Sequence, residues 1–271
     1  MSIIHNIIPK RPLDISKLEK FVSTINNAKH LKKSDSIYYF WIDGKSTRGF
    51  DITIEKESIE VRNTILSNKH DYDLTNIIVA EIIHMTEGVI FDEDETQINK
   101  LPIFSNERIT ETEIQDCEVF QIRSKEYDYS IFGPIREVNF GKQLHEKFKQ
   151  LDGEQLRDKM FEIILTVNYQ IPDFEYGDII RVGKTEKDKK DMKLLANNTD
   201  YIIGKYDYIL LKTSVEQPIM ITNEILNSIL PSSWTRVDEY TIVAPILQED
   251  EWEKLLTNAK KLDLFDNFFK N

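Results

Sequence analysis

The order of apolar and polar residues predicts a helix followed by a group of strands at the start of the chain. Apolar residues recur at helical spacing from Ile15 to Ala28, just after Pro12, so we expect a helix there. The apolar period then changes to two residues, which predicts strands at 37–43, 50–54 and 59–65. Because Asp43-Gly44 is typical of a turn, these strands are expected to form an antiparallel meander with one solvated face.

A second helix is expected after the meander. Its apolar side runs from Leu74 to Met85, with Asp73 as the expected N-cap and Gly88 just past the end. Residues 89–91 then begin a short strand. The order strand, strand, strand, helix, strand is typical of an α+β fold rather than of regular βαβ repetition.

The remaining pattern predicts further strands and helices. Strands are expected at 117–123, 129–132, 135–140, 179–182, 208–212, 219–222, 234–237 and 240–244. Helices are expected from Gly141, within 156–167, and at 223–230 and 249–262, and a polar loop at 183–193. We therefore predict an α+β protein of antiparallel sheets with packed helices, divided into an N-terminal region, 1–145, and a C-terminal region, 146–271. The two regions either share an interface or form one continuous domain, and a boundary is expected between 141 and 177.

Composition narrows the class of protein. The 271 residues are 40% hydrophobic and 30% charged, which supports a folded core and excludes global disorder. The single cysteine, Cys117, cannot form an intramolecular disulfide, and the first ten residues lack a basic segment typical of a signal peptide. No apolar run approaches the length of about 20 residues that spans a bilayer. These features predict a cytoplasmic protein with no membrane association.

The negative charge is concentrated in one segment. The formal net charge is -12, and residues 87–128 contain twelve acidic and four basic residues. Such a concentration steers a basic protein partner and opposes binding to nucleic acid. The leading hypothesis is therefore a protein-binding protein, of which an immunity-type inhibitor of a basic toxin or nuclease is one concrete form. Its expected partner-binding residues are Asp92, Glu93, Asp94, Glu95, Glu111, Glu113, Asp116 and Glu118.

Several motifs of known chemistry are incomplete. The string Gly44-Lys-Ser-Thr-Arg-Gly49 lacks the first glycine and the following helix of a phosphate-binding loop, although Arg48 could still be an exposed contact. Asp92–Glu95 lacks EF-hand spacing, and the five histidines form no zinc signature. Cys117 lies between two acids, which disfavours a thiolate, so a small hydrophobe on a strand is expected. No cofactor or metal is predicted.

An alternative from another class is a metal-dependent nuclease. Pro172-Asp173 followed by Asp188-Lys189-Lys190 matches the loose spacing of a PD...(D/E)xK core. In that chemistry Asp173 and Asp188 hold a divalent ion and Lys190 stabilises phosphate charge. The polar segment 183–193, however, has the pattern of a loop rather than of the strand that this lysine requires.

Two further expectations concern apolar residues. Tyr38, Tyr39, Phe40 and Trp41 could supply the wall of a small-ligand binding module, but alternation places only half of them on one face. The C-terminal helix has an apolar stripe including Leu255, Ala259 and Leu262, which fits either docking on the protein's own core or a homo-oligomer interface.

Overall fold

The computed structural model describes residues 2–183, 185, 187–214 and 217–270. The chain divides into two compact units, unit 1 (Met1–Gln170) and unit 2 (Ile171–Asn271). The division lies inside the interval 141–177 and beyond residue 145, because the helix at 153–165 packs on the helix at 106–124 within unit 1. Both units combine antiparallel strands with packed helices, and the fold is therefore α+β, as the sequence predicts.

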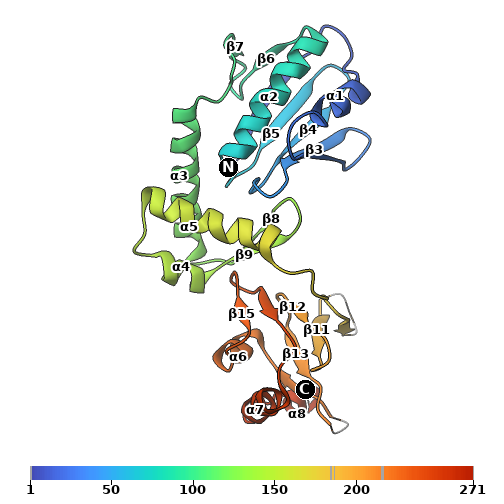
Figure 1. Ribbon diagram of the computed structural model, residues 1–271, viewed down its shortest axis with the longest axis vertical. Coiled ribbons are helices and arrows are strands. Elements are labelled where there is room, and N and C mark those ends of the chain that lie inside the picture. Colours follow the sequence, from blue (N-terminus) through green and yellow to red (C-terminus); the bar gives the residue numbers. More distant parts are fainter. Residues whose placement is uncertain (1, 184, 186, 215–216, 271) are drawn as a thin grey trace. The chain divides into compact units, whose positions relative to one another are not determined.

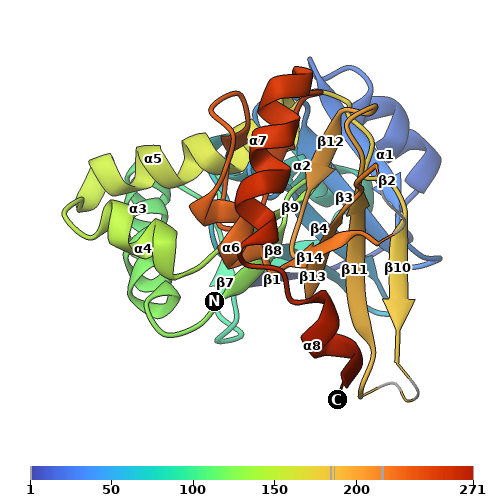
Figure 2. The same cartoon turned by 90° about the horizontal axis from the view of Figure 1, so that it is seen from below.

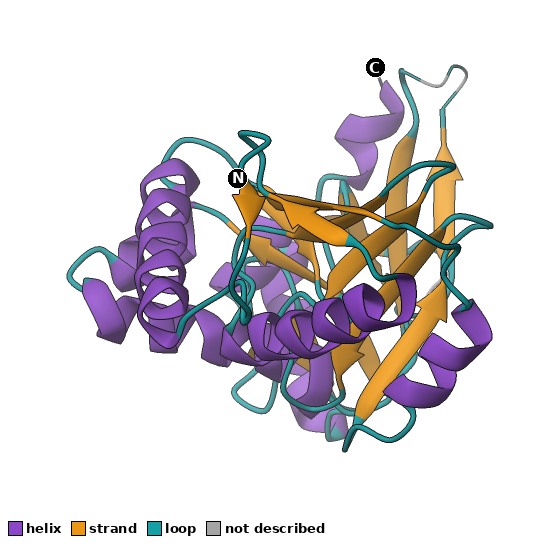
Figure 3. Cartoon of the chain, turned by 90° about the horizontal axis from the view of Figure 1, so that it is seen from above, coloured by secondary structure: helices purple, strands orange, loops and turns teal. Residues whose placement is uncertain are grey.

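Unit 1 contains a seven-stranded sheet in the order β2-β3-β4-β5-β1-β6-β7. Its strands are β1 Ile3–Ile8, β2 Ala28–Lys32, β3 Ile37–Ile42, β4 Phe50–Ile54, β5 Ile59–Asn63, β6 Val89–Phe91 and β7 Gln97–Ile98. All pairs in this sheet are antiparallel. Helices α1 (Ile15–Val22) and α2 (Lys69–Thr86) cover one face of it, as seen in Figure 1 and from above in Figure 3.

The core of unit 1 lies between this sheet and the two helices. Alternate residues of β3, such as Tyr38 and Phe40, point to the core with Phe50 and Ile52 of β4. Burying such side chains stabilises the fold by about 1.5–3 kcal/mol each. The predicted meander is confirmed at β3, β4 and β5.

A helical layer completes unit 1. It contains α3 (Asn106–Ser124), α4 (Lys142–Phe148), α5 (Gly153–Leu165) and a π-helix, η1 (Thr166–Gln170). A hairpin of β8 (Tyr129–Phe132) and β9 (Glu137–Phe140) packs beside them through Phe120, which contacts the rings of Tyr129 and Phe140. The strand expected at 117–123 is wrong, because this segment is the last part of α3.

Unit 2 contains two small sheets. One has the order β10-β11-β13-β14 and the other β12-β16-β15. The strands are β10 Ile179–Val182, β11 Lys190–Leu195, β12 Tyr201–Ile203, β13 Tyr208–Leu211, β14 Ile219–Ile221, β15 Thr235–Arg236 and β16 Ile242–Ala244. Strands β11 and β13 are parallel, which differs from the expected antiparallel arrangement. Residues 190–193 belong to β11 and not to the predicted polar loop.

The helices of unit 2 are α6 (Asn223–Ser228), α7 (Glu249–Lys260) and α8 (Phe265–Lys270). Figure 2 shows α7 and α8 as separate helices at the red end of the chain. The apolar residues of α7, including Leu255 and Ala259, are buried in the core of unit 2 with Trp252. Leu264 and Phe265 pack on the other side of the larger sheet. Leu255 and Ala259 thus dock on the protein's own core, whereas Leu262 of the same stripe is 42% exposed. The homo-oligomer interface stays a prediction.

Candidate functional sites

The loop between β3 and β4 is anchored to the start of α2 by one buried carboxylate. Asp71 accepts hydrogen bonds from the Thr47 hydroxyl (3.0 Å) and from the backbone amides of Arg48 (3.0 Å) and Gly49 (2.9 Å). It also accepts from the amide of Asn68 (3.0 Å), and the Asn68 side chain in turn caps Asp71. This capping box begins α2 at Lys69, so the predicted N-cap at Asp73 is wrong.

The backbone carbonyl groups of the same loop accept hydrogen bonds from side chains outside the loop. The hydroxyl groups of Tyr39 and Tyr169 donate to the carbonyls of Arg48 and Ser46, and Asn68 donates to Lys45. Gly49 has a φ of +62°, and a Cβ there would lie 2.5 Å from a backbone oxygen. The amides that a phosphate-binding loop would offer to a ligand are therefore occupied by the protein's own carboxylate.

Arg48 is not the exposed contact that the sequence suggested. Its side chain is half-buried, and Nε donates to Thr64 Oγ1 (3.1 Å). Burial lowers the pKa of its guanidinium. Among the described residues, Nη1 has no hydrogen-bond partner. The Arg48 side chain therefore binds Thr64 within unit 1 and presents little charge to solvent.

The aromatic run of β3 is divided between the two faces of the sheet. Tyr38 and Phe40 lie in the core, while Tyr39 and Trp41 stack on the other face with ring centroids 5.3 Å apart. Asp51, opposite Tyr39, accepts from Lys33 (2.7 Å) and Arg62 (3.2 Å). Because Tyr39 is only 7% exposed, its ring offers little surface to a ligand, and the small-ligand wall would depend on Trp41.

The acids at 92–95 form a tight turn between β6 and β7. Asp92 accepts from the amides of Asp94 (3.1 Å) and Thr96 (2.8 Å), and Glu93 accepts from the amide of Ile4 (2.6 Å). Asp94 and Glu95 are exposed. The carboxylates of Asp92 and Glu93 therefore hold the backbone of the turn and of β1, while those of Asp94 and Glu95 are exposed to solvent.

The four acids predicted on 111–118 all lie on α3, and they form two pairs that differ in their contacts with the rest of unit 1. Glu111 is exposed and Glu118 half-buried, seven residues apart on one face of the helix. Glu113 is only 6% exposed, and burial raises its pKa to about 6, against the opposing effect of Arg157 at 3.7 Å. Asp116 accepts from the amide of Leu66 (3.1 Å), and burial raises its pKa also.

Glu113 is buried and Asp116 half-buried, and both interact within unit 1, so the proposal below uses only the other six predicted acids. We call the remaining six acids, Asp92, Glu93, Asp94, Glu95, Glu111 and Glu118, the acidic surface. Its two parts are the turn at 92–95 and the pair Glu111 and Glu118 on α3.

Cys117 lies on the buried side of α3. Burial, followed by the charges of Asp116 and Glu113, raises the pKa of its thiol. A buried neutral thiol agrees with the predicted hydrophobic role, although the element is a helix and not a strand.

Two of the three nuclease candidates, Lys190 and Asp188, have other partners. Lys190 pairs with Asp207 (2.9 Å), which raises its pKa, and Asp188 accepts from the Thr185 hydroxyl (2.6 Å). Asp173 is exposed in the segment before β10. Across the described residues, no group of three or more His, Cys, Asp or Glu is arranged to hold a metal. Residues 184 and 186 of the predicted loop lie outside the described residues.

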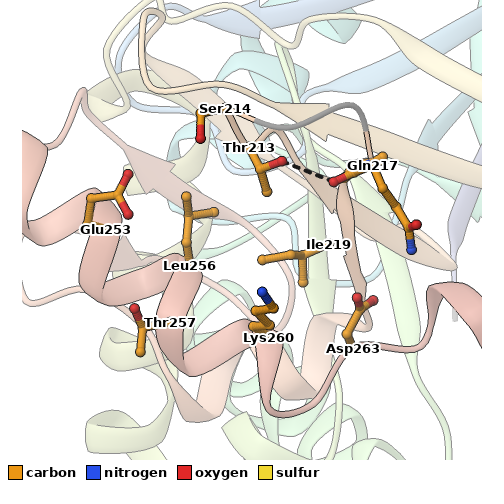
Figure 4. A pocket seen from close by; sticks show the side chains of 10 residues that line it. Thr213, Ser214, Gln217, Ile219, Glu253, Leu256, Thr257, Lys260 and Asp263 are labelled. Atoms are coloured by element: carbon orange, nitrogen blue, oxygen red, sulfur yellow. Dashed lines mark hydrogen bonds between the residues drawn. The ribbon is translucent and has the colours of Figure 1, made fainter.

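A groove in unit 2 was missed by sequence reasoning. It has a volume of about 470 Å³ and lies between α7 on one side and residues 213–214 and 217–219 on the other (Figure 4). Ser214, Ile219, Glu253, Thr257, Lys260 and Asp263 are among the residues that line it. Its walls come from segments about 40 residues apart in sequence, so no local motif could have indicated it.

Together, these features define an α+β protein in two compact units, with an acidic surface on the first and a groove on the second. The chain belongs to the family described as Domain of unknown function (DUF4299), whose model matches residues 6–170. The match ends at the last residue of unit 1, and unit 2 lies outside it. No curated protein and no solved structure matches the chain. In the described part of the chain, no helix has both the length and the apolar composition needed to cross a bilayer.

Proposed function

We propose that this protein binds a basic protein partner through the acidic surface of unit 1, as an immunity-type inhibitor of a toxin or nuclease would. The observation that carries the proposal is the state of the carboxylates. Among the described residues, none of the six acids of the acidic surface is part of an ion pair. Unpaired acids of one sign repel each other, and a basic partner relieves that repulsion and associates faster.

Exposed apolar residues beside these acids support the same proposal. Ile122, one helical turn beyond Glu118 on α3, is 66% exposed, and Leu101 and Tyr127 are also exposed. Apolar anchors within a charged rim are typical of protein interfaces. On a nuclease-like partner, the carboxylates would take the place of phosphate groups and occlude the substrate cleft. The single cysteine, Cys117, is free and buried, which agrees with a cytoplasmic location for this inhibitor.

The test is affinity capture from the source organism with two matched charge-reversal variants. Glu111→Lys/Glu118→Lys changes the acidic surface, and Glu57→Lys/Glu154→Lys changes exposed acids elsewhere on unit 1. We expect the wild type and the control to capture a basic protein, and the first variant to associate at least about tenfold more slowly. Capture should also fall as salt is raised. Equal capture by both variants would show that Glu111 and Glu118 are not part of the binding site, and capture that is indifferent to salt would contradict binding through the acidic surface.

A further inference from the structure

The groove of unit 2 has charged groups at its two ends and an apolar floor between them. Glu253, Thr257 and Lys260 lie on one face of α7, because they are separated by four and three residues. Leu256 from the helix and Ile219 from β14 are largely buried and form the floor. Figure 4 shows the Glu253 carboxylate directed toward Ser214, and the Lys260 side chain directed toward Ile219.

Other polar groups in the groove are already used by the fold. Asp263 accepts from the amides of Met220 (3.0 Å) and Phe265 (3.0 Å), which ties the turn after α7 to β14. Thr213 donates to the carbonyl of Gln217 (3.0 Å). By contrast, Glu253 and Lys260 make no ion pair with any described residue. These two opposite charges are therefore available to a ligand.

The spacing of the two charges selects a ligand of a certain length. Seven residues of helix separate Glu253 from Lys260, which corresponds to about 10 Å along the axis. An extended peptide spans about 3.3–3.6 Å per residue, so three residues bring an amino terminus and a carboxyl terminus to that separation. The volume of about 470 Å³ is within the range of small-ligand sites, about 300–1,000 Å³.

We propose that this groove binds a short peptide of about three residues with both termini free. Its ammonium group pairs with Glu253, its carboxylate pairs with Lys260, and a central apolar side chain rests on Leu256 and Ile219. A second hollow of about 250 Å³ shares Glu253 and Leu256 with the groove and extends it toward Trp252, which leaves room for the first side chain. The site is in unit 2 and does not depend on the acidic surface.

Titration calorimetry of the full-length protein with the tripeptide Ala-Leu-Ala tests the proposal. We expect saturable binding, at least about tenfold weaker binding when the amino terminus is acetylated, and a similar loss when the carboxyl terminus is amidated. Glu253→Gln should abolish the discrimination against acetylation, and Lys260→Met the discrimination against amidation. Asp250→Asn, an exposed change on α7 outside the groove, should bind all three peptides as the wild type does.

Two results would overturn the proposal. One is the absence of saturable binding of Ala-Leu-Ala to the folded wild type up to about 10 mM. The other is equal affinity for the free and the blocked peptides, which would mean that the two charges do not contact the termini. Circular dichroism of each variant establishes that it is folded, so that loss of binding is not mistaken for loss of structure.

Discussion

Asp71 in unit 1 and Lys193 in unit 2 are both completely buried, with an exposed fraction of 0%, and they differ in their partners. Asp71 accepts hydrogen bonds from one hydroxyl and from backbone amides of the loop and the helix start. Lys193 Nζ has no hydrogen-bond partner among the described residues. A buried charge stabilises a fold only where its hydrogen bonds are satisfied. Asp71 meets this condition, and Lys193 does not.

The surroundings of Lys193 explain why it is unpaired. It lies on β11 beside Ile209 of β13, and its ammonium group is 4.9 Å from the centre of the Tyr201 ring. Gly177 covers it, and a Cβ at that position would lie 2.3 Å from Nζ. Burial lowers the pKa of Lys193, although Asp178 and Glu175 oppose the shift. The comparison therefore predicts opposite effects when the two side chains are removed.

The largest effect is expected for Asp71→Ala. The change leaves the backbone amides of Arg48, Gly49 and Asn68 without their carboxylate acceptor, so unit 1 should lose about 4 kcal/mol of unfolding free energy. Asp73→Ala, on the same helix, removes only an exposed pair with Lys69 and should cost less than about 1 kcal/mol. Urea unfolding of both variants measures the difference. Similar losses in the two variants would contradict a special role for the Asp71 network.

Lys193→Met is expected to raise the unfolding free energy of unit 2, the opposite of the effect of Asp71→Ala on unit 1. The lowered pKa means that, below the ordinary lysine pKa, the unfolded chain holds this proton more tightly than the folded chain. The full cost of burial is therefore present below the folded pKa, and it declines as the pH rises toward 10.5. Methionine keeps most of the volume without a charge, so unit 2 should gain about 2 kcal/mol at pH 7.

Hydrogen exchange of the β11 and β13 amides measures this gain separately from unit 1. Lys254→Met, at an exposed lysine of unit 2, is the control and should leave the exchange nearly unchanged. If Lys193→Met instead speeds exchange in β11 and β13, the ammonium group must have a stabilising interaction in solution, and the contrast with Asp71 would fail.

The sequence predicted elements whose apolar pattern is local and missed those that depend on distant contacts. The meander was predicted because Phe50, Ile52 and the neighbouring strands alternate regularly. The helix at 106–124 was missed because its buried side includes polar Glu113 while its exposed side carries Ile122, so the helical period is obscured. Strand β1 was missed because His5 and Asn6 interrupt its apolar run, although β5 and β6 pair on either side of it.

The same contrast between local patterns and distant contacts applies to the candidate sites. Acidic clustering at 92–95 is visible in the sequence, because neighbouring residues of a turn remain neighbours in space. The burial of Glu113 and Asp116 depends on Arg157 and Leu66, which are distant in sequence. The start of α2 was the exception, since the spacing Asn68-x-x-Asp71 is a local capping-box signal that could have been used.

The smallest expected effect concerns His5, the uncharged counterpart of Lys193 in unit 1. His5 is buried against the edge of the Phe104 ring, and neither ring nitrogen has a hydrogen-bond partner among the described residues. Burial lowers its pKa from 6.5 to about 4. Above pH 6.5 both the folded and the unfolded states are neutral, and no stability is lost. As the pH falls toward 4 the unfolded chain takes up the proton first, so stability declines across that window.

Between pH 7.5 and pH 5.5 this linkage should cost the wild type about 1 kcal/mol that His5→Leu does not lose. Unfolding free energies of both proteins at the two pH values measure it, because the titration of other groups cancels in the difference. His84→Leu, at an exposed histidine of α2, is the control for replacing a histidine by leucine. A difference between wild type and His5→Leu that stays constant with pH would mean that His5 is hydrogen-bonded or solvated in the native state, and its likeness to Lys193 would be lost.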